Sequence, residues 1–266
     1  MSVRLISITK PYCPRCEVSF AGASICSAHQ KKQTAEDLIA YTARVSNPAN
    51  QNNTETTPRL LAYLIKNKHW SPFEMVSMTV EIETSRGIAQ QILRHRSFSF
   101  QEFSQRYAQA TEIVEYPARR QDVKNRQNSI DDLMQADKDW FRDAQKEIAT
   151  ASLTKYDEAL ARGIAKEQAR FLLPIGTATR LYMSGTARSW IHYIQLRADP
   201  ATQLEHREIA EGCKTIFAEQ FPCTSEALGW KSSESSEPKN YVGTVDAGAS
   251  RPIDISVVVD TTRTHS

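Results

Sequence analysis

The sequence predicts an α+β fold in which a mixed β-sheet is flanked by helices, including one long amphipathic helix. Residues 74–84 alternate between apolar and polar side chains, which is typical of a strand with one buried face. Residues 129–162 instead place apolar side chains at helical spacing, between a capping signal at Ser129–Asp132 and Gly163. Shorter segments of both kinds surround these two, and we expect them to complete one sheet and its helical cover.

Start and stop signals place the remaining elements. A short strand is expected at 3–9 and another at 181–185. Thr34 and Asp37 form a capping box, and Thr57 precedes a proline in the first turn of the next helix. Further helices are expected to begin near Ser85, Ile164, Thr186 and Ala201.

Bulk composition limits the class of protein. The chain has 266 residues, 40% of them hydrophobic, and we expect a single domain at 1–230, with a Cys/His-containing insertion at about 11–30. The polar segment 231–266 is expected to be a flexible tail. A net charge of +2 gives no bulk attraction to nucleic acid, and no apolar run approaches the ~18 residues of a membrane helix. Without an export signal, and with five cysteines, we expect a cytoplasmic protein without a disulfide scaffold.

The insertion holds a possible metal site. Its four candidate ligands form two pairs, each separated by two residues: Cys13, Cys16, Cys26 and His29. Thiolate and imidazole groups suit tetrahedral zinc. The alternative is a loop insertion that carries incidental free cysteines.

The most informative stretch runs from Gln91 to Tyr107, where Arg94, His95, Arg96 and Arg106 lie close together. Arginines in such number repel one another unless an anionic group lies among them, and their planar forks suit a phosphate or the edge of a polar heterocycle. A solvated basic loop is the alternative. Three phenylalanines within the stretch would bury parts of it and argue against that alternative: Phe98, Phe100 and Phe103.

More cationic groups follow further along the chain. Arg170 lies beside an apolar run, Arg188 and His192 share one face of a predicted helix, and Arg197 lies on the opposite side. The sequence contains no Gly-rich dinucleotide fingerprint, phosphate loop or Gly-x-Ser-x-Gly elbow. These observations favour a pocket that binds and polarises an anionic heterocycle, with a bound cofactor for the harder chemistry.

The arginine stretch resembles a known family. Arg94-His95-Arg96, followed after seven residues by Ser104, is similar to the signature of the flavin-dependent thymidylate synthases. The blocks Ala43–Ser46 and His69–Glu74 resemble upstream blocks of that family, and 187–199 resembles its second half. The resemblance covers roughly residues 1–10 and 34–221, in the family's order and spacing.

The resemblance implies conversion of dUMP to dTMP. The one-carbon group would come from methylenetetrahydrofolate, and FAD recharged by NADPH would supply the reduction. Family members are homotetramers with active sites shared between subunits and an α+β fold. No protein residue need form a lasting covalent bond to the uracil, so Ser104 is expected to contact the substrate rather than act as a nucleophile.

The resemblance also assigns site residues by position. The dUMP group would be Gln91, Arg94, Glu102, Ser104, Arg106, Arg170 and Arg197, the last from another subunit. The FAD group would be Ser71, Glu74, Arg94, His95, Arg96, Arg188 and His192. The residues at the reacting centre would be Arg94, Ser104, Arg197 and His69.

Two features depart from the family. Thr186 stands where many members have an asparagine against the flavin, and neither the insertion nor the tail has a counterpart in the family core. Two alternatives stay open. One is a relative that acts on another pyrimidine nucleotide or transfers a hydroxymethyl group, and the other is a zinc-dependent module that binds nucleic acid through the arginine stretch.

Overall fold

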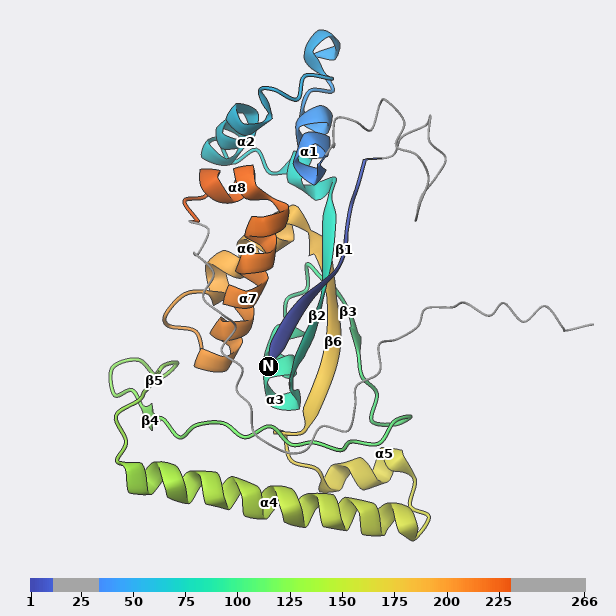
Figure 1. Ribbon diagram of the computed structural model, residues 1–266, viewed down its shortest axis with the longest axis vertical. Helices are drawn as coiled ribbons and strands as arrows, with labels where there is room; N and C mark the ends of the chain where they lie inside the picture. The colour runs from blue at the N-terminus through green and yellow to red at the C-terminus, as the bar shows by residue number, and fades with distance from the viewer. Residues whose placement is uncertain (12–33, 231–266) are drawn as a thin grey trace, which may run out of the picture.

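A computed structural model describes residues 1–11 and 34–230 of the protein (Figure 1). Its centre is a four-stranded sheet in the order β1-β2-β6-β3. The strands are β1 (Ser2–Ile8), β2 (Ser77–Ser85), β6 (Ala178–Thr186) and β3 (Ser99–Glu102). The alternation predicted around residues 74–84 is confirmed, because Met78, Val80 and Ile82 are buried on one face of β2. The α+β class is also confirmed.

The expectation of a mixed sheet is wrong, because the neighbouring strands described here are all antiparallel. Helices α1 and α2, which connect β1 to β2 along the chain, lie at one end of the sheet in Figure 1. Helices α4 and α5, which belong to the connection from β3 to β6, lie at the other end. Each long connection therefore brings the chain back to the end of the sheet at which it left. A parallel neighbour would need a crossover along the sheet.

Helices α6 (Ala187–Arg197) and α7 (Leu204–Gln220) lie against the sheet (Figure 1). Between them and the sheet lies the main core, which includes Trp190, Tyr193 and Phe217. The indole Nε1 of Trp190 donates to the carbonyl oxygen of Met78 at 2.9 Å, so the largest core side chain has a partner for its polar group. The other helices are α1 (Ala35–Ala43), α2 (Thr57–Lys66), α3 (Arg86–Ile92), α5 (Lys166–Ala169) and α8 (Pro222–Ala227).

The long helix α4 (Gln135–Ala161) is present, but it begins later than its capping signal predicted. Ser129–Ile130 forms strand β5, paired with β4 (Arg120–Gln121). The guanidinium of Arg119 donates to the Ser129 hydroxyl at 2.8 Å and to its carbonyl oxygen at 2.7 Å. These contacts hold Ser129 in the hairpin, so its hydroxyl does not cap a helix. Three short 3₁₀ turns complete the fold: η1 (Pro48–Asn50), η2 (Ser71–Glu74) and η3 (Arg170–Leu172).

Phe98 anchors the arginine stretch to the core. Its ring is buried at 4.8 Å from the ring of Trp190, and it packs on Gly185 of β6. A Cβ atom at Gly185 would lie 2.5 Å from Phe98 Cδ1. The sequence prediction that phenylalanines bury part of this stretch is confirmed for Phe98, whereas Phe103 remains 36% exposed.

We expect Gly185→Ala to lower the free energy of unfolding by about 1–3 kcal/mol, because the methyl group would force Phe98 out of its site. Urea denaturation measures the change. The control is Gly87→Ala, where the new Cβ would meet nothing closer than 3.5 Å and the stability should not fall. A Gly185→Ala protein as stable as the wild type would contradict this packing.

Candidate functional site

The arginine stretch leaves the last turn of α3 and continues into β3. Arg94 and Arg96 lie in the turn between these elements and are exposed. Among the described residues, neither of these two side chains forms a hydrogen bond or an ion pair. The buried side chain of Phe98 anchors this turn to the core. The guanidinium groups of Arg94 and Arg96 are therefore exposed on a backbone that is held in place. The helix expected to begin near Ser85 is confirmed as α3 (Arg86–Ile92) and ends at the arginine stretch, which then continues into β3.

Arg197, at the end of α6, joins this stretch. Its Nε donates to Nε2 of His95 at 2.9 Å. The acceptor nitrogen needs a free lone pair, so His95 is neutral with its proton on Nδ1. Burial, followed by the charges of Arg197, His192 and Arg94, lowers the pKa of His95 to about 4. The pair therefore fixes one edge of the Arg197 guanidinium, and its two terminal nitrogens remain available to a ligand.

Behind this pair lies a buried polar group that the sequence analysis missed. His206 of α7 is 0% exposed, and in the described part of the chain neither ring nitrogen has a hydrogen-bond partner. Its ring lies 6.1 Å from that of His95 and 5.9 Å from that of Tyr193, whose hydroxyl also lacks a partner there. Burial, then Arg197 and His95, lowers the pKa of His206 to about 3, so the imidazole is neutral. The helical pattern could have revealed it, since His206 falls on the apolar stripe of Ile209, Ala210 and Cys213.

A second bridge joins α3 to α7. Gln91 Nε2 donates to Gln203 Oε1 at 2.6 Å, and Gln203 Nε2 donates to Glu205 Oε2 at 2.8 Å. Gln91 was predicted as a site residue. Gln203 and Glu205 were not, because nothing local in the sequence shows that they meet it.

Three other predicted residues gather around α5. Arg106 Nε lies 3.4 Å from Glu167 Oε2, and Arg170 Nε donates to the carbonyl oxygen of Glu167 at 3.2 Å. Ser104 begins the turn that carries Arg106, and its Oγ accepts from the Arg106 N–H at 3.4 Å. Within the described residues no base contacts Ser104 Oγ, and its role as a substrate contact stays a prediction. No hydrogen bond described here joins this group to the Arg197–His95 pair.

Glu102 has two partners within its own chain. Its Oε1 accepts from Arg86 Nη1 at 3.0 Å and from Thr179 Oγ1 at 2.9 Å. Arg86 was missed by the sequence analysis because no local pattern links it to Glu102. Because Glu102 Oε1 already accepts these two hydrogen bonds, we expect a ligand to donate to Oε2.

The predicted cofactor residues lie along η2 and the exposed face of α6. Arg188 Nη1 donates to Glu74 Oε1 at 2.5 Å, which ties the two elements together. Ser71, His69 and His192 are exposed nearby in these same segments or just before them. Thr186 caps α6, because its hydroxyl accepts from Ser189 N at 3.3 Å. The threonine at this position, where many family members have an asparagine, therefore caps the helix.

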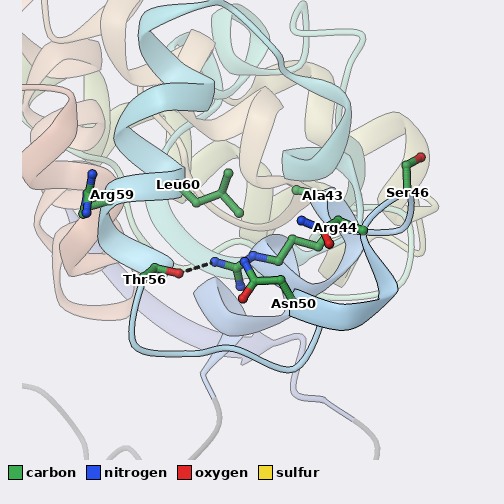
Figure 2. Close-up of a pocket in the computed structure, with 8 residues that line it drawn as sticks. Ala43, Arg44, Ser46, Asn50, Thr56, Arg59 and Leu60 are labelled. Atoms are coloured by element: carbon green, nitrogen blue, oxygen red, sulfur yellow. Dashed lines mark hydrogen bonds between the residues drawn. The ribbon is translucent and has the colours of Figure 1, made fainter.

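A cavity of about 470 Å³ lies beside the Ala43–Ser46 block (Figure 2). Its lining residues are Ala43, Arg44, Ser46, Asn47, Asn50, Thr56, Arg59 and Leu60. Arg44 is buried and donates to Thr56 Oγ1 at 2.8 Å and to the carbonyl oxygen of Asn53. A second cavity, of about 350 Å³, lies between β2, β6 and the segment 109–114. Phe103 of the arginine stretch lines the second cavity, whereas the arginines of the stretch line neither cavity.

Comparison with known proteins identifies the family. Residues 29–223 match the family model described as thymidylate synthase complementing protein. A flavin-dependent thymidylate synthase of Synechocystis sp. is 55% identical over 86% of this chain and 100% of its own length. This chain belongs to the flavin-dependent thymidylate synthase family. A probable flavin-dependent thymidylate synthase of Paramecium bursaria Chlorella virus 1 is 51% identical over the same shares of the two chains.

A solved structure supports the fold. The UMP/dUMP methylase PolB from Streptomyces cacaoi, bound with 5-Br dUMP, superposes with a TM-score of 0.70 at 24% identity, over 86% of this chain and 94% of that one. The expected membership in the flavin-dependent thymidylate synthase family is confirmed, and with it the dependence on FAD. The family favours an enzyme over the zinc-dependent module.

Other expectations for this family member concern the subunit that supplies Arg197, a zinc site and membrane helices. Arg197 contacts His95 of its own chain, and the expectation that it reaches the substrate of another subunit stays a prediction. The zinc ligands Cys13, Cys16, Cys26 and His29 lie outside the described residues, and zinc remains a prediction for metal analysis. None of the described helices is both long and apolar enough to cross a membrane.

The neutral histidines give a pH dependence of stability. An unfolded histidine takes up a proton near pH 6.5, whereas folded His206 resists protonation down to about 3. The unfolded chain therefore binds more protons as the pH falls below 6.5, and stability present above that pH is progressively lost. We expect His206→Leu to reduce this slope by about one proton, or about 1.4 kcal/mol per pH unit.

Denaturant unfolding between pH 7 and pH 5 measures the slope. The control is Ile209→Leu, which lies on the same buried stripe and cannot titrate. An unchanged slope in His206→Leu would show that His206 is protonated or exposed in the folded protein. Because His206 lacks partners, we also expect the variant to be no less stable at pH 7.

Proposed function

We propose that this family member converts dUMP to dTMP, with methylenetetrahydrofolate as carbon donor and FAD, reduced by NADPH, as the source of reducing equivalents. The observation that carries the proposal is the pairing of Arg197 with a neutral His95 beside the free guanidinium groups of Arg94 and Arg96. In the reaction a new C–C bond forms at C5 of the uracil and the C5 proton is lost. Charge develops on the ring carbonyl oxygens, and preorganised donors stabilise it.

The residues divide between the two ends of the nucleotide. Arg94 and Arg197 donate to the uracil ring, and the His95 contact holds Arg197 in place for that purpose. Arg106 and Arg170 bind the phosphate. Glu167 contacts both arginines, and a phosphate dianion would compete with its carboxylate for Arg106.

In the described part of one chain, no hydrogen bond joins the residues proposed for the uracil ring, Arg94 and Arg197, to those proposed for the phosphate, Arg106 and Arg170. This separation supports a site completed by two subunits. Glu102 and Ser104 would lie between the groups because they are close in sequence to both. Gln91 contacts the ring.

FAD suits the exposed donors on η2 and α6. Its pyrophosphate is an anion, and Arg188 and Arg96 are exposed cations, while Ser71 and His192 are exposed polar side chains that can donate hydrogen bonds. When bound, the reduced flavin supplies the hydride that completes the methyl group. Glu74 holds Arg188, and His69 lies at the end where folate would approach. Because the Thr186 hydroxyl caps α6, the flavin contact that an asparagine would make at this position would pass to a neighbouring residue.

The exposed side of α4 supports a homotetramer. Trp140 is 70% exposed and Phe171 of η3 is 75% exposed. Other large apolar side chains on or beside these elements are also exposed: Met134, Phe141, Ile148, Ile164, Leu172 and Ile175. Apolar exposure on this scale marks an interface, and copies of this chain would cover it. We place the protein in the cytoplasm, with residues 1–230 as a single catalytic domain and 231–266 as its tail.

We expect the purified protein to show a flavin absorption spectrum after incubation with FAD, and NADPH to bleach it faster when dUMP is present. Mass analysis of products from dUMP and dCMP, with methylenetetrahydrofolate, would detect dTMP from dUMP. A hydroxymethyl product, or a product from dCMP, would point to the alternative reactions. A protein that cannot bind FAD would contradict the proposal.

We expect Arg94→Ala to lower dUMP-dependent turnover by about 10²–10³-fold, because it removes a donor aimed at the developing charge. The flavin spectrum should persist. The matched control is Arg126→Ala, an exposed arginine outside the site, which should keep wild-type turnover. Equal turnover in the two variants would reject the role of Arg94.

We expect Trp140→Glu to dissociate the tetramer, because a charge would be buried in an apolar interface. Light scattering after size-exclusion chromatography measures the mass. Lys146→Glu, an exposed charge change on the same helix, should leave the mass unchanged. A tetramer that survives Trp140→Glu would place the interface elsewhere.

A further inference from the structure

The cavity beside the Ala43–Ser46 block carries positive charge without an opposite charge. Arg44 and Arg59 both line it, and none of its lining residues is acidic. Arg44 is only 7% exposed, and among residues 1–11 and 34–230 no carboxylate forms an ion pair with either arginine. Burying a charge is costly unless an opposite charge compensates it. The cavity, of about 470 Å³, therefore has the charge of an anion-binding site.

The protein partners of Arg44 orient its guanidinium but do not neutralise it. Nη1 donates to the carbonyl oxygen of Asn53, and Nη2 donates to Thr56 Oγ1 at 2.8 Å (Figure 2). An arginine has five N–H groups, so further donors remain for a ligand. Asn50 adds another, because its Oδ1 accepts from Asn53 Nδ2 at 2.9 Å while its own Nδ2 donates to no group in the described part of the chain. A fixed guanidinium beside an amide donor suits a phosphate.

The cavity lies within reach of the residues proposed for the flavin. Helix α1 packs against η2, which carries Ser71 and Glu74. The cavity lies at the C-terminal end of α1, and the whole helix has nine residues and is about 14 Å long. A dinucleotide with one end in the cavity can therefore place its other end at the flavin.

We propose that this cavity binds a dianionic phosphate monoester, the 2′-phosphate of NADPH. The inference rests on the proposed role of NADPH as reductant, since dUMP and FAD have other proposed sites. NADPH differs from NADH only by this phosphate on the adenosine ribose, and arginine is suited to bind it. Two guanidinium groups match its two negative charges, and Ala43 and Leu60 give the cavity an apolar wall for the attached nucleoside.

The variant that tests the site is Arg59→Ala, because Arg59 is exposed on α2 and its removal leaves the core intact. The measurement is calorimetric binding of NADP⁺ and NAD⁺ to the FAD-loaded protein, since these oxidised forms do not reduce the flavin. We expect the wild type to prefer NADP⁺ by about tenfold or more, and Arg59→Ala to lower this preference by about tenfold, equivalent to about 1.4 kcal/mol. Arg59→Glu should lower it further, because it places a negative charge at the cavity.

The matched control is Lys66→Ala, which removes an exposed cation from the same helix outside the cavity and should keep the wild-type preference. Equal binding of the two nucleotides by the wild type, or an unchanged preference in Arg59→Ala, would overturn the inference. Loss of FAD binding in Arg59→Ala, with the preference unchanged, would assign the cavity to the phosphates of FAD and overturn it as well.

Formation of dTMP by the same wild-type protein separates this inference from the proposed function. Turnover of dUMP with NADPH, together with no preference that depends on Arg59, would overturn the NADPH site alone. A preference that Arg59→Ala removes, in a protein that forms no dTMP, would keep the phosphate site and overturn the proposed function.

Discussion

The contact between Arg197 and a neutral His95 is the interaction on which the site depends. An arginine beside a histidine is stable only if the imidazole stays unprotonated, and burial together with the surrounding cations ensures this. The contact also joins the end of α6 to the turn after α3. The fold thus holds several cationic groups close together by keeping one member of the group neutral, and the remaining guanidinium nitrogens stay available for an anionic ligand.

Beneath the site, two buried side chains have polar atoms without hydrogen-bond partners in the described part of the chain, those of His206 and Tyr193. His206 and Tyr193 fill space that an apolar side chain could fill at lower cost, since each buried polar atom without a partner costs about 1–3 kcal/mol. Phe98 closes this region from the other side by packing on Gly185. The site therefore lies on a rigid aromatic base, and exposed loops contribute only the outermost cations.

The sequence predicted well what local patterns determine. The alternation in β2, the capping box at Thr34 and the cap at Thr186 are all present, because each depends on residues within one or two turns of one another. It could not predict contacts between distant segments. Glu36, for example, is buried and accepts from the backbone N–H groups of Cys223 and Thr224 at 3.2 and 2.6 Å, so it caps α8 from another part of the chain. The antiparallel pairing, the Arg86–Glu102 ion pair and the contact between Gln91 and Gln203 likewise join segments that are distant in the sequence.

The contact between Gln91 and Gln203 and the contact between His95 and Arg197 respond differently to pH. The Arg197–His95 contact is lost when His95 becomes protonated, as the pH falls toward about 4, because a charged imidazole cannot accept and would repel the guanidinium. The two glutamines have no titratable group. The contact between Gln91 and Gln203 should therefore not respond to the protonation that breaks the Arg197–His95 contact, whereas binding that depends on Arg197 should weaken as His95 takes up a proton. The charge on His95 would therefore govern how firmly Arg197 is held for an anionic ligand.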